Sequence, residues 1–193
     1  MLLFYDTETT GFPDKYKPLG HPSQPHCVQL AGILAREDGY EVSSINLIIR
    51  PDGWSIPKAC SDIHGITDEV ANAGGIREVV AAACFYDLLS RADMVIAHNE
   101  QFDRKIVGTM FERAGRGWVI DKPSLCTMEE SSALVNLPPT ERMIAAGIDK
   151  PKSPKLEEAY WHFFGEKLEG AHDALVDVRA CARVYFHLMK ERT

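Results

Sequence analysis

The sequence lacks any long hydrophobic run. A membrane-spanning helix needs about 20 consecutive apolar residues, and no run in the 193 residues approaches that length. The apolar stretch from Met1 to Tyr5 is followed at once by Asp6, without the basic region and small-residue cleavage site of a secretory signal. We therefore expect a cytoplasmic protein that does not enter a membrane.

Cysteine is scarce, and its spacing shows no pairing. The five cysteines are an odd number, lie far apart and form no Cys-x-x-Cys pair. A disulfide framework or a structural zinc site would need such pairing. Both are therefore excluded as the basis of the fold.

The sequence also lacks an excess of basic residues. Its 21 Lys and Arg are outnumbered by 28 Asp and Glu, so the net charge is −7. Proteins that coat a duplex usually present a basic surface to the phosphates, which disfavours that kind of binding. An enzyme that meets nucleic acid through bound metal ions remains compatible, because the ions supply part of the positive charge.

The order of the predicted elements indicates an α/β protein with a mixed central sheet flanked by helices. Hydrophobic periodicity predicts strands over about 1–8, 27–37, 41–50, 94–97 and 124–127, longer helices over about 76–89, 100–114, 155–164 and 173–190, and short helices near 67 and over 140–146. Asp38-Gly39 predicts a hairpin turn between the second and third strands. We find no repeat and no linker, so we expect one domain over residues 1–193.

Two features within this pattern are specific enough to be compared with a structure. In the helix over 76–89, Val79, Val80 and Leu88 fall on one face, which predicts that this face is buried. The stretches 12–26 and 136–154 contain four prolines each and are predicted loops. Either loop is long enough to narrow a site and to set substrate preference.

The first candidate site is the acidic pair Asp6 and Glu8 at the end of the first strand. Side chains two apart in a strand project to the same face. Two ionised carboxylates held close repel each other, and burying them is costly unless a cation lies between them. Mg²⁺ and Mn²⁺ favour such oxygen ligands. Taken alone, the segment fits an acidic surface turn equally well.

The second candidate segment is 98–103, His-Asn-Glu-Gln-Phe-Asp, where a buried strand becomes a helix. Open α/β sheets bind their ligands at this edge. Asn99 is a suitable N-cap, and Asp103 falls in the first turn, where the helix dipole favours an anion. Taken alone, the segment is explained better by an acid that only stabilises the helix.

The third candidate segment is 172–177, His-Asp-Ala-Leu-Val-Asp, at the start of the last helix. Asp173 is a suitable N-cap, which puts Asp177 in the first turn and His172 just outside the helix. A helix cap beside a solvated histidine is again the better explanation of the segment by itself. Together, however, the three segments place four carboxylates and a histidine at the ends of apolar elements. That set suits metal-assisted phosphodiester hydrolysis, with histidine accepting a proton from water.

The motifs DTETTG at 6–11, HNEQFD at 98–103 and HDALVD at 172–177 resemble the three signature motifs of the DEDDh, or DnaQ-like, 3′→5′ exonucleases. Their order agrees with the family, and they extend over nearly the whole chain. The resemblance implies an RNase H-like fold and hydrolysis of phosphodiester bonds at the 3′ end of single-stranded nucleic acid, DNA favoured and RNA possible. The products would be nucleoside 5′-monophosphates.

The resemblance also implies residue roles. It implies two Mg²⁺ or Mn²⁺ ions held by Asp6, Glu8, Asp103 and Asp177, with Asp6 bridging them, and His172 as the general base. The 3′-terminal nucleotide would lie against Thr7, Thr9, Thr10, His64 and Ile66, with Asn99 assisting. A plain loop role stays open for His64. Phe12, beside the first motif, is the aromatic residue we expect to stack on a base.

A non-catalytic or accessory module is the alternative, using the same fold to bind a polymerase or a nucleic-acid end. The complete acidic set argues against it. Proofreading, DNA repair with a polymerase or repair partner, and RNA trimming all stay open, as does the oligomeric state. The short segment after the last predicted helix favours a stand-alone enzyme over a replicative proofreading subunit.

Overall fold

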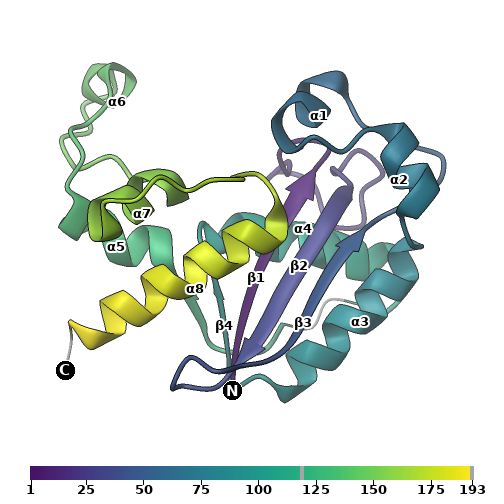
Figure 1. The fold of residues 1–193 in the computed structure, drawn as a ribbon. Coiled ribbons are helices and arrows are strands. Elements are labelled where there is room, and N and C mark those ends of the chain that lie inside the picture. Colours follow the sequence, from purple (N-terminus) through teal and green to yellow (C-terminus); the bar gives the residue numbers. More distant parts are fainter. Residues whose placement is uncertain (118–119, 192–193) are drawn as a thin grey trace.

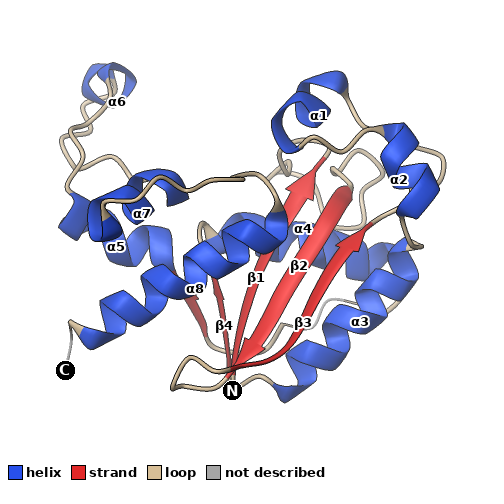
Figure 2. Ribbon diagram, in the orientation of Figure 1, coloured by secondary structure: helices blue, strands red, loops and turns tan. Residues whose placement is uncertain are grey.

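A computed structural model describes residues 1–117 and 120–191 and contains a five-stranded mixed sheet with helices on both faces (Figures 1 and 2). The strands are β1 (Leu2–Thr9), β2 (Cys27–Ala35), β3 (Glu41–Ile48), β4 (Met94–Ala97) and β5 (Ser124–Cys126), in the spatial order β3-β2-β1-β4-β5. β1 and β2 pair antiparallel, as do β2 and β3, whereas β1, β4 and β5 run parallel. The predicted mixed sheet is confirmed.

Helices cover the two faces of the sheet unequally. The helices are α1 (Lys58–His64), α2 (Asp68–Gly74), α3 (Glu78–Arg91), α4 (Glu100–Arg113), α5 (Thr127–Val135), α6 (Glu141–Ala145), α7 (Leu156–Phe164) and α8 (Ala174–Lys190). α3 and α4 lie on one face and α8 on the other (Figure 1). None of the helices in the described ranges has the length and apolar character that crossing a bilayer demands.

Alternation along β1 connects the two cores and sets the direction of its acidic residues. Leu3 and Tyr5 pack in the core beneath α3 and α4, whereas Leu2 and Phe4 pack against α8. Burial on both faces explains why the strand is apolar without interruption from Leu2 to Tyr5. By the same alternation, Asp6 and Glu8 continue the face that α8 covers.

The buried face of α3 differs from the predicted one. Val79 and Val80 are 42% and 36% exposed, so their predicted burial is wrong, whereas Leu88 is buried as expected. The buried residues of this helix are Ala81, Ala82, Phe85, Leu88 and Leu89. Two alanines bring the helix close to the sheet, and the large ring of Phe85 then fills the space. Hydrophobicity along the chain did not separate this face from the neighbouring valine face.

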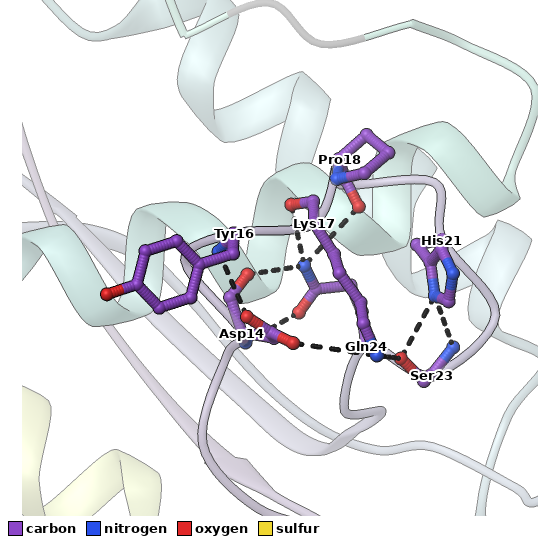
Figure 3. Close-up of polar contacts among 7 residues, drawn as sticks. All are labelled: Asp14, Tyr16, Lys17, Pro18, His21, Ser23 and Gln24. Carbon is purple, nitrogen blue, oxygen red and sulfur yellow. Dashed lines mark hydrogen bonds and ion pairs between the residues drawn. The ribbon is translucent and has the colours of Figure 1, made fainter.

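The proline-rich loop 12–26 is folded around the side chain of Gln24 (Figure 3). Gln24 is 3% exposed, and its Nε2 donates to the carbonyl oxygens of Asp14, Lys17 and Pro18 at 2.9–3.3 Å. Its Oε1 accepts from the Asp14 N–H at 3.0 Å. Arg113 at the end of α4 donates to the Gln24 carbonyl at 2.6 Å. The loop is therefore held both internally and against α4.

Replacing Gln24 by leucine is expected to loosen this loop. Leucine has a similar volume but leaves the partly buried Asp14 N–H without its acceptor, at a cost of about 1 kcal/mol. Faster tryptic cleavage after Lys15 and a lower urea midpoint would show the effect. Gln101→Leu is the control, because Gln101 is exposed and has no side-chain hydrogen bond among the described residues. Equal cleavage of the two variants would contradict the role of Gln24.

Candidate active site

The four predicted carboxylates come from three elements that meet above the end of β1. Asp6 and Glu8 extend from the strand, Asp103 lies in the first turn of α4, and Asp177 lies in the first turn of α8. The parallel pairing of β1 and β4 places the start of α4 beside the end of β1. α8 reaches the same point from the other face of the sheet.

Thr7 fixes the position of Asp103. The Asp103 side chain is 2% exposed, and its Oδ1 accepts from the Thr7 backbone N–H at 3.0 Å and from Thr7 Oγ1 at 2.7 Å. Thr7 faces α4 because it alternates with Asp6 and Glu8, which face α8. A single short stretch of β1 therefore supplies two acids and the anchor of a third.

A second buried acid strengthens the same junction and was not singled out from the sequence. Glu100 is 4% exposed and accepts from Tyr5 Oη at 3.0 Å and from Arg104 Nε at 2.7 Å. Because its charge is paired, it is a structural link between β1 and α4. Glu100 lies within the second motif, but the sequence did not indicate its role, because its partner Tyr5 is 95 residues away.

The start of α8 is held by a cap and by a glutamine on β2. Asp173 accepts from the N–H groups of Leu175 and Val176, as predicted for an N-cap. Gln29 Nε2 donates to Asp173 at 3.2 Å, and Gln29 Oε1 accepts from the Ala174 N–H at 3.1 Å. Gln29 is 3% exposed. No local pattern pointed to it, because it acts through a segment 144 residues further along the chain.

His172 is held on left-handed backbone directly before this helix. Its φ is 70°, and its N–H donates to Asp177 Oδ2 at 3.0 Å. Its side chain is 50% exposed, and Nε2 lies 3.8 Å from Glu157 Oε1 on α7. The imidazole therefore stands at the mouth of the acidic cluster, between a site acid and solvent.

Three of the predicted residues come close enough to share one ion. Ligand atoms of Glu8, His172 and Asp177 all lie within 4.8 Å of one another. Asp177 Oδ1 is buried and has no hydrogen-bond partner in the part of the chain that the structure describes. His172, which the resemblance makes the base, thus also stands at ligand distance from two acids.

Burial and mutual repulsion raise the pKa of every acid in the cluster. Burial raises the pKa of Asp6 well above its usual range, and the charge of Asp103 adds to this. Burial, together with nearby Asp177, raises the pKa of Glu8 to about 8. Burial also raises the pKa of Asp103 to about 8 and that of Asp177 to about 6, although hydrogen bonds from Thr7 and from the His172 backbone oppose these shifts. The cluster carries more acid than the surrounding protein neutralises.

These residues fit a hard divalent cation. Carboxylate oxygens are the ligands that Mg²⁺ and Mn²⁺ prefer. Asp177 Oδ1, which accepts no hydrogen bond from the described residues, belongs to the side chain that lies near Glu8 and His172. A bound cation would stabilise the ionised carboxylates against both the burial and the repulsion that raise their pKa values. Both the donor set and its electrostatics are therefore those of a metal site.

The acidic cluster opens into a cleft of about 410 Å³. Of the predicted nucleotide-binding residues, Thr7, Phe12 and Asn99 line it. Phe12 is 90% exposed, and its ring lies 5.9 Å from that of Phe102. Asn99 occupies the N-cap position with φ of 72° but makes no side-chain cap bond, so the predicted capping role is wrong. Its amide is free of that bond and borders the cleft.

The other predicted nucleotide-binding residues do not line the cleft. Thr9 Oγ1 donates to the Gly11 carbonyl at 2.8 Å, and Thr10 Oγ1 accepts from the His26 N–H at 2.8 Å. Ile66 is 7% exposed and packs in a small core, which leaves little surface for a base. His64 Nδ1 accepts from the Ile66 N–H at 3.1 Å, whereas its buried Nε2 has no partner among the described residues.

The opposite wall of the cleft was not predicted in detail. It comes from residues 153–157, including Lys155 and Glu157, and from Met128 and Ala171. His98 holds this wall in place, since its ring lies 2.9 Å from Thr127 Oγ1 and 3.0 Å from the Pro154 carbonyl. Burial lowers the pKa of His98 to about 4, so the ring is neutral at pH 7. Ser153 and Pro154 belong to the loop 136–154, which was predicted to be able to set substrate preference.

A mixed α/β sheet with carboxylates gathered at the ends of its central strands is the architecture of the RNase H-like nucleases. The sequence matches the family described as Exonuclease (RNase_T) over residues 3–185. The chain belongs to this exonuclease family, and the predicted RNase H-like fold and the prediction of an exonuclease are confirmed.

Solved exonuclease structures share the fold. E. coli exonuclease I in complex with a dT13 oligonucleotide is 22% identical with a TM-score of 0.78, and the match covers 99% of this chain and 41% of that chain. A zinc-bound E. coli exonuclease I–ssDNA complex is 23% identical with a TM-score of 0.74, covering 100% and 40%. Exonuclease I from Methylocaldum szegediense is 23% identical with a TM-score of 0.73, covering 100% and 40%. The chain thus spans about two fifths of the length of these proteins. No curated protein sequence matches it significantly.

Proposed function

We propose that this chain is a metal-dependent exonuclease that removes nucleoside 5′-monophosphates from the 3′ end of single-stranded DNA. The observation that carries the proposal is the convergence of Asp6, Glu8, Asp103 and Asp177 with His172 around one cleft. DNA is favoured because structures of similar fold hold single-stranded DNA oligonucleotides. RNA stays an alternative, since the choice depends on contacts to the 2′-hydroxyl.

In this proposal, Asp6, Glu8, Asp103 and Asp177 hold two Mg²⁺ or Mn²⁺ ions. Bound there, the ions supply positive charge for the attacking and leaving oxygens of an in-line displacement. The supporting observation is the set of raised pKa values, which follow from the burial of several carboxylates close together. Thr7 keeps Asp103 in place through two hydrogen bonds.

The protein's own residues account for proton transfer and substrate positioning. His172, exposed at the mouth of the cluster, accepts the proton of the attacking water. The bond from its N–H to Asp177 and the neighbouring Glu157 hold the imidazole near the acids. Phe12 and Phe102 offer aromatic surface on which the terminal base stacks. Thr7 and Asn99 border the same cleft, whereas roles for Thr9, Thr10, His64 and Ile66 stay predictions.

The proposal is tested with single-stranded oligonucleotides labelled at one end. With Mg²⁺ or Mn²⁺, a 5′-labelled strand should shorten one nucleotide at a time, and a 3′-labelled strand should release labelled mononucleotide first. EDTA should stop both reactions. Asp6→Asn should abolish degradation without loss of thermal stability, because it removes one of the repelling charges. The control Asp149→Asn changes an exposed acid in the loop after α6.

Two outcomes would overturn the proposal. Full activity of Asp6→Asn would remove the acidic cluster from the reaction. Calorimetry that finds no divalent-metal binding while a nucleic-acid complex still forms would favour a non-catalytic module. A cytoplasmic location, a single domain over 1–193 and a polymerase or repair partner stay predictions from the sequence.

A further inference from the structure

A second concave site lies away from the acidic cleft, at the junction of the loop after β3, the start of α3 and the end of α4. It encloses about 410 Å³. Figure 1 shows the start of α3 beside α2, on the β3 side of the sheet, whereas α8 begins above β1. The two sites share no lining residue. This second site is called the arginine pocket here, after Arg50, Arg77 and Arg113, which line it.

Backbone pairing holds two of these arginines side by side. Ile49 and Ile76 form an isolated parallel bridge, and the Arg50 N–H donates to the Ile76 carbonyl at 2.8 Å. Gly75 permits this approach, because a Cβ there would lie 2.7 Å from the Arg50 nitrogen. Arg50 and Arg77 each follow a bridge residue directly, so the backbone pairing places them next to each other.

Neither of these two guanidinium groups is paired within the part of the chain that the structure describes. Among residues 1–117 and 120–191, the side chains of Arg50 and Arg77 make no hydrogen bond, ion pair or ring contact. Asp52 also lines the pocket but forms no ion pair with either of them. The chain has a net charge of −7, yet these two adjacent cations form no ion pair with any described acid. Like charges held together are stabilised by an anion between them.

The third arginine and the aromatic side chains of the pocket are held by other contacts. Arg113 is engaged with the Gln24 and Pro25 carbonyls and lies 3.8 Å from Glu78. The ring of His26 stacks on Trp54 at 4.4 Å with an interplanar angle of 9°. Burial and the charge of Arg113 lower the pKa of His26 to about 4, so this stack is neutral. The pocket therefore offers two free guanidinium groups beside a fixed aromatic wall.

We propose that the arginine pocket binds a backbone phosphate of a single-stranded nucleic acid whose 3′ end lies in the acidic cleft. Guanidinium groups recognise phosphate oxygens through charge-assisted hydrogen bonds, and arginine pairs are suited to this ligand. An indole beside a phosphate site provides stacking surface for the attached base. The proposal rests on the proposed function for the nature of the strand. A free mononucleotide carries the same phosphate chemistry and is the competing source.

The two sites are connected through the first motif strand. The His26 N–H donates to Thr10 Oγ1, and the Thr10 N–H donates to the His26 carbonyl. Thr10 follows Glu8 by two residues, so the aromatic wall of the arginine pocket is attached to the end of the catalytic strand. A strand held at both sites would be oriented relative to the acids, and the second contact would strengthen binding of longer substrates only.

The test compares Arg50→Ala/Arg77→Ala with Arg142→Ala/Lys150→Ala, which removes two exposed, unpartnered cations elsewhere among the described residues. Fluorescence anisotropy in EDTA measures binding of a labelled 16-mer and a labelled 4-mer without hydrolysis. The first variant should weaken 16-mer binding on the order of 10-fold. It should also reduce the salt slope of log K by about 0.7, the contribution of one single-strand phosphate contact. The 4-mer should bind and, with Mg²⁺, be degraded as by the unaltered protein.

Three results would overturn the inference. The arginine pocket is not a strand site if both double variants bind the 16-mer equally. A saturable change of tryptophan fluorescence with dTMP that Arg50→Ala/Arg77→Ala abolishes, combined with unchanged 16-mer affinity, assigns the pocket to a mononucleotide instead. An equal loss of 4-mer and 16-mer binding would indicate a general structural defect. If no form of the protein degrades the 4-mer, the proposed function fails, while 16-mer binding still reports on the pocket.

Discussion

Replacing His172 by alanine is expected to lower the rate of nucleotide release about 10²–10⁴-fold, the usual contribution of a positioned general base. The backbone N–H of residue 172 still donates to Asp177 in this variant, so the acid loses no hydrogen bond. The side chain is half exposed, which makes the change tolerable for folding. Single-turnover degradation of a labelled oligonucleotide at saturating Mg²⁺ measures the effect.

The same variant also tests whether His172 binds the metal, because its ring lies at ligand distance from Glu8 and Asp177. If His172 acts only as a base and does not bind the metal, the Mg²⁺ affinity of His172→Ala, measured by calorimetry, should be unchanged. If His172 is a metal ligand, the variant should bind Mg²⁺ more weakly and recover part of its activity at high Mg²⁺. His162→Ala, an exposed histidine on α7, is the control and should keep full activity. Full activity of His172→Ala would remove this residue from the mechanism.

The second large effect concerns stability without metal. In EDTA, the free energy of unfolding is expected to fall as the pH rises from about 6 to about 8. Burial raises the pKa of Asp177 to about 6 and that of Glu8 and Asp103 to about 8. The folded protein therefore holds more protons than the unfolded chain across this range. Stability present at low pH is lost as these groups ionise.

Two histidines act in the opposite direction at lower pH. Burial lowers the pKa of His26 and of His98 to about 4. Below about pH 6.5 the unfolded chain binds protons that the folded protein does not, so these groups make stability rise with pH. Their contribution ends near pH 6.5, and the decline above that pH is assigned to the acidic cluster.

Mg²⁺ should reverse the decline. A ligand that binds only the folded state stabilises it by about 2.7 kcal/mol at 100 times its dissociation constant, and this gain should grow from pH 6 to pH 8. Thermal unfolding with Mg²⁺ or with EDTA at matched ionic strength measures it. Asp177→Asn should flatten the pH dependence and reduce the Mg²⁺ shift, whereas Asp149→Asn should change neither. A stability curve that is flat from pH 6 to pH 8 in EDTA would contradict the repulsion inferred for the cluster.

Features that depend on neighbouring residues in the chain were predicted well. The Asp173 cap, the β2–β3 hairpin and the mixed sheet agree with the structure, because each follows from a local pattern. The alternation that carries Asp6 and Glu8 to one face also follows from strand geometry alone. The failures were local too: Asn99 lacks its cap bond, and the valine face of α3 is exposed. In both, tertiary packing overrode a short-range preference.

The sequence by itself determined the exonuclease family, the mixed α/β class and the acids at the ends of the apolar elements, since motif order and periodicity are written along the chain. Only the tertiary structure decided which distant groups meet. Gln29 holds the start of α8, His98 holds the wall that carries Glu157, and β-bridge pairing sets Arg50 beside Arg77. The physical reason is that such contacts join residues tens to more than a hundred positions apart. The local sequence around one residue does not identify its partner, because the two come within hydrogen-bond range only when the sheet and its helices are assembled.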